Sequence, residues 1–239
     1  MSEENAEESS MEGKVNSEVE VHEEESRSEI EGGSETVEEV VEKTEINVEF
    51  LVRHRVHYGR RTKTTFSEDY IYRTHPRGFF LIDVKKTIEK LKVAAKFLSR
   101  FPPDKVIICS AREYAERGIE KMCEITGMAS KTGRFLPGTL TNYVLKEHRE
   151  VDLIFVVDHN YDKQAVKEAT KMKIPVISFV DTNSFPRLVD LAIPANSKGR
   201  SSLAALFWSL TVLYLRARGL LGEDEVIDLP VEDFMVAIE

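Results

Sequence analysis

Short runs of residues that are apolar at almost every position alternate, along most of this chain, with segments whose apolar residues recur at helical spacing. The runs cover residues 79–82, 106–109, 153–157 and 176–180, with a weaker one at 191–193. Strands that are apolar on both sides are typical of a parallel sheet covered by helices on both faces. The repetition of strand, helix and strand therefore predicts an α/β protein. The expected fold is a three-layer α/β/α sandwich, Rossmann-like or flavodoxin-like, with a mainly parallel sheet of about five strands.

Helix signals separate these runs. An apolar helical stripe begins directly after Asp83, which is a good N-cap residue. Ser110 and Glu113 have the spacing of a capping box for a second helix, which Gly127 would end. A third helix is expected from about residue 162 to 172. These helices would form the crossovers that a parallel sheet requires.

The charges of this chain are segregated. Residues 1–50 hold 18 acidic and 3 basic residues, and residues 223–239 hold 7 acidic residues and no Lys or Arg. The body between them, with 30 basic and 17 acidic residues, is basic although the whole chain has a net charge of −9. We expect a disordered acidic tail at 1–45, a folded domain at 46–222 and an acidic extension at 223–239. A basic domain indicates a polyanionic partner, although a solvated lysine-rich surface has the same composition.

Other features of the chain exclude several classes of protein. Cys109 and Cys123 are the only cysteines, and Cys109 lies within an apolar run, so we expect buried thiols in a reducing cytoplasm and no structural zinc. Residues 201–215 carry no charge, but a segment of this length is shorter than the roughly 20 residues that cross a bilayer. We therefore expect a buried helix there, and no membrane partner.

Basic and aromatic residues are interleaved between residues 53 and 78. Arginine matches phosphate oxygens in pairs, and tyrosine or histidine can stack on unpaired bases, so this density favours RNA contact. A second basic segment, Lys198-Gly199-Arg200, opens a helix, where backbone N–H groups can receive a phosphate. The predicted RNA-binding residues are Arg53, Arg55, His57, Tyr58, Arg60, Arg61, Lys63, Arg73, Arg77, Lys198 and Arg200.

An enzyme is the alternative reading. Asp83, Asp158 and Asp181 each follow an apolar run, and carboxylates at the carboxyl ends of parallel strands would hold Mg²⁺ for phosphoryl transfer. Helix capping is the simpler explanation, because Asp and Ser are favoured where a strand passes into a helix, and capping alone accounts for Asp83 and Ser110. Gly133 and Gly138 have the spacing of the two glycines of a P-loop, but the lysine that follows in a P-loop is missing.

Two motifs carry a resemblance to a known family. They are GRFLPGTLTN at 133–142, and DTNS at 181–184 followed by VDLAIPANSKGR at 189–200. The sequences of these motifs resemble those of the universal small-subunit ribosomal protein S-two family in its archaeal form. In addition, residues 101–104 pass directly into the next apolar run, without the helical hairpin that the bacterial branch inserts.

The resemblance implies a function without catalysis. It implies a structural constituent of the small ribosomal subunit, held in the cytoplasm by ribosomal RNA and by neighbouring ribosomal proteins. It implies no cofactor, no metal and no small-molecule substrate. A protein-interaction module is a third reading, because eukaryotic members of the family have been linked to extracellular matrix binding, but no residue of this chain favours it.

Overall fold

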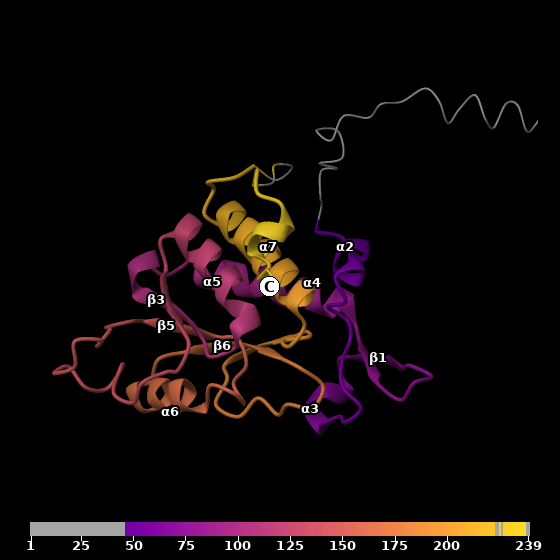
Figure 1. Ribbon diagram of the computed structural model, residues 1–239, viewed down its shortest axis with the longest axis horizontal. Helices are drawn as coiled ribbons and strands as arrows, with labels where there is room; N and C mark the ends of the chain where they lie inside the picture. The colour runs from indigo at the N-terminus through magenta and orange to yellow at the C-terminus, as the bar shows by residue number, and fades with distance from the viewer. Residues whose placement is uncertain (1–45, 223–224, 226, 238–239) are drawn as a thin grey trace, which may run out of the picture. The chain divides into compact units, whose positions relative to one another are not determined.

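The computed structural model describes residues 46–222, 225 and 227–237, so the acidic tail expected at 1–45 lies outside the described residues. The centre of the fold is a parallel five-stranded sheet in the order β4-β3-β5-β6-β7 (Figure 1). Its strands are β3 (Val106–Ser110), β4 (Ala129–Thr132), β5 (Leu153–Val156), β6 (Val176–Val180) and β7 (Leu191–Pro194). The predicted α/β sandwich with a parallel sheet of about five strands is therefore confirmed.

One strand of the predicted sheet lies elsewhere. The run at 79–82 forms β2 (Phe80–Ile82), which pairs antiparallel with β1 (Ile71–Thr74) in a separate two-stranded sheet. The fifth strand of the main sheet is instead β4 (Ala129–Thr132), which the apolar pattern did not predict. This strand lies at the edge, is only partly buried and contains polar residues, so it has no continuous apolar run.

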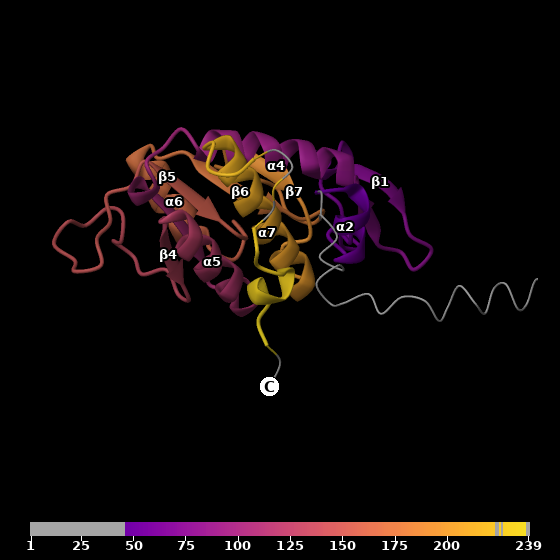
Figure 2. The ribbon, with the colours of Figure 1, turned by 90° about the horizontal axis from the view of Figure 1, so that it is seen from above.

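The helices cover the two faces of the sheet unequally. Three of them, α4 (Val84–Leu98), α5 (Glu113–Thr126) and α7 (Arg200–Ala217), cover one face, and α6 (Lys163–Met172) covers the other (Figure 1). Figure 2 shows α7 running between α4 and α5, and it contacts both. The expected buried helix at 201–215 is thus confirmed as part of α7. Among the residues that the structure describes, no helix is long and apolar enough to span a membrane.

Alternation along the strands divides the core into two clusters. On β3, Val106 and Ile108 face the three-helix side, whereas Ile107 and Cys109 face α6. The three-helix side is packed so closely that a Cβ added to Gly118 would lie 2.8 Å from the Phe207 ring. Glycine at this position therefore lets α5 approach α7.

The helix termini agree with the sequence at two places and differ at a third. The Asp83 carboxylate accepts a hydrogen bond from the Lys85 N–H, and Gly127 ends α5 in the left-handed conformation, as predicted. The expected capping box at the start of α5 is wrong. The N-cap of α5 is Arg112 instead, because β3 continues through Ser110. The Ser110 hydroxyl accepts a hydrogen bond from the Arg112 N–H at 3.0 Å.

Short helical elements complete the described part of the fold. The other helical elements of the described residues are α2 (Val48–Arg53), α3 (Thr65–Glu68), η1 (Pro103–Lys105) and η2 (Val231–Phe234). The η2 turn packs on α5 and α7, where Phe234 is fully buried and the Trp208 indole N–H donates to the Leu229 carbonyl at 2.9 Å. The acidic C-terminal segment therefore contributes to the core of the described domain.

Candidate nucleic-acid interface

A segment that follows α2 docks on the loop after β6, at the carboxyl end of the sheet. The Gly59 N–H donates to the Phe80 carbonyl at 2.9 Å, and the Arg60 N–H donates to the Thr182 hydroxyl at 2.8 Å. A Cβ at Gly59 would lie 2.5 Å from the Thr182 methyl carbon and 2.9 Å from the Phe80 oxygen. This contact requires glycine, because any larger residue would separate the two segments.

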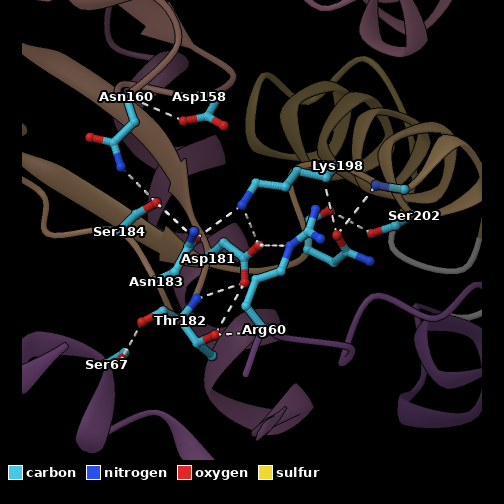
Figure 3. A network of polar contacts seen from close by, with 12 residues as sticks. Arg60, Ser67, Asp158, Asn160, Asp181, Thr182, Asn183, Ser184, Lys198 and Ser202 are labelled. Atoms are coloured by element: carbon cyan, nitrogen blue, oxygen red, sulfur yellow. Dashed lines mark hydrogen bonds and ion pairs between the residues drawn. The ribbon is translucent and has the colours of Figure 1, made fainter. Parts of the chain in front are cut away.

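Asp181, the first residue after β6, joins the two basic segments. Its fully buried carboxylate lies 3.1 Å from Lys198 Nζ and 3.4 Å from Arg60 Nε, and one of its oxygens accepts a bond from the Thr182 N–H. Figure 3 shows Arg60 and Lys198 reaching Asp181 from separate parts of the chain. Since one carboxylate holds two cations, the cluster keeps a positive charge in a fixed position.

An open groove of about 930 Å³ lies beside this cluster. Its walls are mostly basic and aromatic, and they are formed by Tyr58, Gly59, Arg60, Arg61, Thr62, His75, Arg77, Phe79, Asn183 and Lys198. Five of the predicted RNA-binding residues are among them, namely Tyr58, Arg60, Arg61, Arg77 and Lys198. The fold thus brings together residues from three separate parts of the chain.

The groove also contains aromatic residues that the predicted set of RNA-binding residues did not include. The rings of His75 and Phe79 are stacked, with centroids 4.3 Å apart and planes at 14°, and the Tyr58 ring lies 5.3 Å from that of Phe79. The sequence pattern places Phe79 in the apolar run at 79–82. The signal that could have placed these two rings together is the Pro76-Arg77-Gly78 turn between them.

The other six predicted residues do not line the groove. Arg53, Arg55 and Arg73 are exposed elsewhere, and Lys63 forms an exposed ion pair with Glu68 at 2.9 Å. The remaining two have structural contacts. The His57 ring packs edge-on against the Tyr58 ring, with centroids 4.5 Å apart, and burial lowers the pKa of His57. The Arg200 guanidinium donates to the Val236 carbonyl at 2.8 Å. The groove is therefore a smaller and better defined candidate RNA-binding site than the predicted set of RNA-binding residues.

The three aspartates of the enzyme alternative lie in separate environments. Asp83 follows β2, outside the main sheet, and caps α4. The Asp158 carboxylate is paired with the Arg112 guanidinium at 2.6 Å, and Asp181 holds its two cations. Within the described ranges there is no group of three or more residues that could hold a metal ion. The geometry therefore gives no support to a magnesium-dependent enzyme.

The motif at 133–142 has a structural role on the face of the sheet that α6 covers. The Glu168 carboxylate on α6 accepts hydrogen bonds from the N–H groups of Gly138, at 2.7 Å, and Leu140, at 3.1 Å. Gly138 has a φ of 97°, which favours glycine, and the side chains of Phe135 and Leu140 are buried against the sheet. This motif thus covers one face of the sheet, and in sequence it is distant from the basic segments that form the groove.

Comparison with known proteins identifies the family. Residues 51–151 and 144–213 match the family model described as Ribosomal protein S2. The chain is 45% identical over 181 residues to the small ribosomal subunit protein uS2 of Pyrobaculum neutrophilum, covering 75% of this chain and 88% of that protein. It is 42% identical over 195 residues to uS2 of Aeropyrum pernix, covering 82% and 95%. For uS2 of Saccharolobus solfataricus the identity is 41% over 179 residues, covering 75% and 78%. These three relatives are archaeal, and the chain belongs to the ribosomal protein S2 family.

Proposed function

We propose that this protein is a structural constituent of the small ribosomal subunit and binds ribosomal RNA through the groove beside Asp181. The relatives are named as small ribosomal subunit proteins, and neither the family nor the geometry supports an enzyme. The observation that carries the proposal is the clustering of Arg60, Arg61, Arg77 and Lys198 around one open groove.

The proposed mechanism is positional and involves no reaction. Arginine side chains neutralise backbone phosphates, and each phosphate neutralised releases condensed counterions. Asp181 holds Arg60 and Lys198 in place before RNA arrives, so fewer side-chain rotamers are lost on binding. The protein would thereby fix RNA segments relative to its rigid sheet, with shape read more than sequence.

The wider assignment follows from the family. We propose that neighbouring small-subunit ribosomal proteins are further partners and that the protein works on the ribosome in the cytoplasm. The folded body at 46–222 would carry the RNA-binding surface, and the described part of the acidic extension at 223–239 packs against that body through Phe234.

The test is the salt dependence of binding to small-subunit ribosomal RNA. For the wild-type chain, the logarithm of the association constant should fall linearly with the logarithm of the salt concentration. Arg61→Gln and Arg77→Gln should each reduce the slope by about 0.7–0.9. Lys167→Gln also removes one positive charge, but from the exposed surface of α6, so it is the matched control and should leave the slope unaltered. Equal effects of all three substitutions, or the absence of binding at low salt, would refute the proposal.

Sedimentation of the protein in cell extract gives an independent check. We expect it to co-migrate with the small ribosomal subunit at moderate salt. Migration as a free protein under the same conditions would contradict the assignment.

A further inference from the structure

We propose that the groove is a binding site for one unpaired RNA nucleotide, with its base against the rings of Tyr58, His75 and Phe79 and its phosphate beside Arg61 and Arg77. This inference rests on the proposed function and adds the class of ligand that the groove accepts. Phosphate binding alone would need only the cations. The arrangement of the aromatic residues supports the additional contact with a base.

The aromatic wall is held rigidly. The His75 N–H donates to the Phe79 carbonyl at 2.7 Å and the Gly78 N–H donates to the His75 carbonyl at 2.8 Å, which closes the turn between the two rings. The Arg77 N–H donates to His75 Nδ1 at 3.2 Å, which also fixes the orientation of the imidazole. A rigid aromatic surface loses little conformational entropy when a base stacks on it.

These rings are accessible from the groove. Tyr58 is 39% exposed, and both His75 and Phe79 are partly exposed where they line the groove. A volume of about 930 Å³ is within the range of pockets that hold small ligands, so a single nucleotide fits. A base inside a duplex is stacked on both sides and cannot reach such a wall, so the ligand must be an unpaired nucleotide.

The cations of the groove fall into two classes. Arg60 and Lys198 are held by Asp181, whereas the guanidinium groups of Arg61 and Arg77 have no ion pair within the described part of the chain. A free guanidinium presents paired N–H donors that match two phosphate oxygens. Arg61 and Arg77 are therefore the residues expected to bind the phosphate of the nucleotide.

Asn183 adds a group that can contact the edge of a base. Its Oδ1 accepts a hydrogen bond from Lys198 Nζ at 3.0 Å, which fixes the direction of the amide. Its NH₂ group has no partner among the residues that the structure describes, and the residue is exposed on the groove wall. This amide can therefore donate to an acceptor on the base.

The test compares two RNA hairpins that differ in one nucleotide. One carries a single bulged 2-aminopurine in its stem and the other has a fully paired stem, and in both a base-free polyethylene glycol linker replaces the nucleotides of the loop. The full-length chain should bind the bulged hairpin about ten-fold more tightly, since stacking on aromatic side chains contributes most of that preference. Binding should also change the 2-aminopurine fluorescence, because the base moves onto an aromatic surface.

Substitutions separate stacking from charge. Tyr58→Leu and Phe79→Leu should each reduce the preference for the bulged hairpin by about five-fold or more, with the salt slope unchanged. Arg61→Gln should weaken the binding of both hairpins and lower the slope. The matched control is Tyr72→Leu, because Tyr72 is 71% exposed on β1 and does not line the groove. The urea midpoint of each variant, followed through Trp208 fluorescence, verifies that it is folded.

The outcomes distinguish this inference from the proposed function. Equal affinity for both hairpins, with a normal salt slope, would overturn the nucleotide site and leave ribosomal RNA binding intact. An equal loss for Tyr72→Leu and Tyr58→Leu would overturn it as well. Failure to bind either hairpin or ribosomal RNA would overturn both. Competition by micromolar free AMP would show that the groove is a mononucleotide site and would overturn its assignment to RNA.

Discussion

Replacing Glu168 by alanine should destabilise the domain by removing the group that holds the loop at 133–142 on the sheet. Glu168 is 3% exposed, and its two oxygens accept bonds from the backbone N–H groups of Gly138 and Leu140 and from the Gln164 amide. An alanine can accept none of these bonds. The loop then keeps its apolar contacts but loses its polar anchor.

The size of the effect follows from the exposure of the two backbone donors. Leu140 is 1% exposed, so its N–H cannot reach water, and an unsatisfied buried donor costs about 1–3 kcal/mol. Gly138 is partly exposed and loses only a bond to a charged acceptor, worth about 1.5 kcal/mol. The free energy of unfolding should therefore fall by about 3–4 kcal/mol, which lowers the Tm of a domain of this size by about 10 °C.

Urea unfolding monitored by Trp208, the only tryptophan, measures this change. Lys167→Ala on the exposed side of α6 is the matched control and should change the free energy of unfolding by less than about 0.5 kcal/mol. Glu168→Gln, which keeps one acceptor oxygen, should have about half the effect of alanine. A loss below about 1 kcal/mol for Glu168→Ala, with unchanged hydrogen exchange at the amides of Gly138 and Leu140, would refute the reasoning.

Three further predictions concern other parts of the fold. Gly59→Ala places a Cβ against Thr182 and the Phe80 carbonyl, so it should lower the free energy of unfolding by about 1–3 kcal/mol and weaken RNA binding. Unchanged RNA binding would contradict the role of Gly59 in holding the groove segment on the loop after β6. Burial raises the pKa of Asp162 from its ordinary value of 3.8 to about 6, so the folded state is destabilised above pH 6 and this cost disappears as the pH falls below 4. Asp162→Asn should therefore increase the free energy of unfolding at pH 8 by up to about 3 kcal/mol, and should give no gain at pH 4 in the same urea titrations. Burial and the nearby Asp162 carboxylate raise the pKa of Cys109, so an alkylating reagent at pH 8 should modify this thiol only at urea concentrations that unfold the protein, and rapid modification of the native protein would contradict its burial.

The fold could be predicted from the sequence wherever burial has a local pattern. The runs that form β3, β5 and β6 are buried at every position and apolar except for Ser110 and Ser178, because helices or loops cover both faces of the sheet there. The same pattern could not identify the partner of a strand. The run at 79–82 is apolar at every position, but it pairs with β1, and nothing within the run distinguishes that pairing from a place in the main sheet. Conversely, β4 has one neighbour and partial exposure, so its sequence gives no such signal.

The candidate site could be predicted as a class of residues but not as a geometry. Clustered arginine and tyrosine indicate RNA contact, yet Tyr58 and Arg61 line the groove while Arg53 and Arg55 do not. The selection depends on contacts between distant positions, such as the bond from the Arg60 N–H to Thr182, 122 residues later in the chain. No local spacing encodes such a contact.

The two family motifs therefore have different physical roles, and the roles follow from their contacts. The motif at 133–142 satisfies its backbone donors with a buried carboxylate from α6, so its glycine and turn residues serve the stability of the cover. The motif at 181–184 begins instead with a buried carboxylate that binds two cations from other segments. A buried charge costs several kcal/mol unless it is paired, so Asp181 requires Arg60 and Lys198 as much as it positions them. The position of the basic groove is thus coupled to the folding of the carboxyl end of the sheet, which explains how a chain with an acidic total charge can present a localised positive surface.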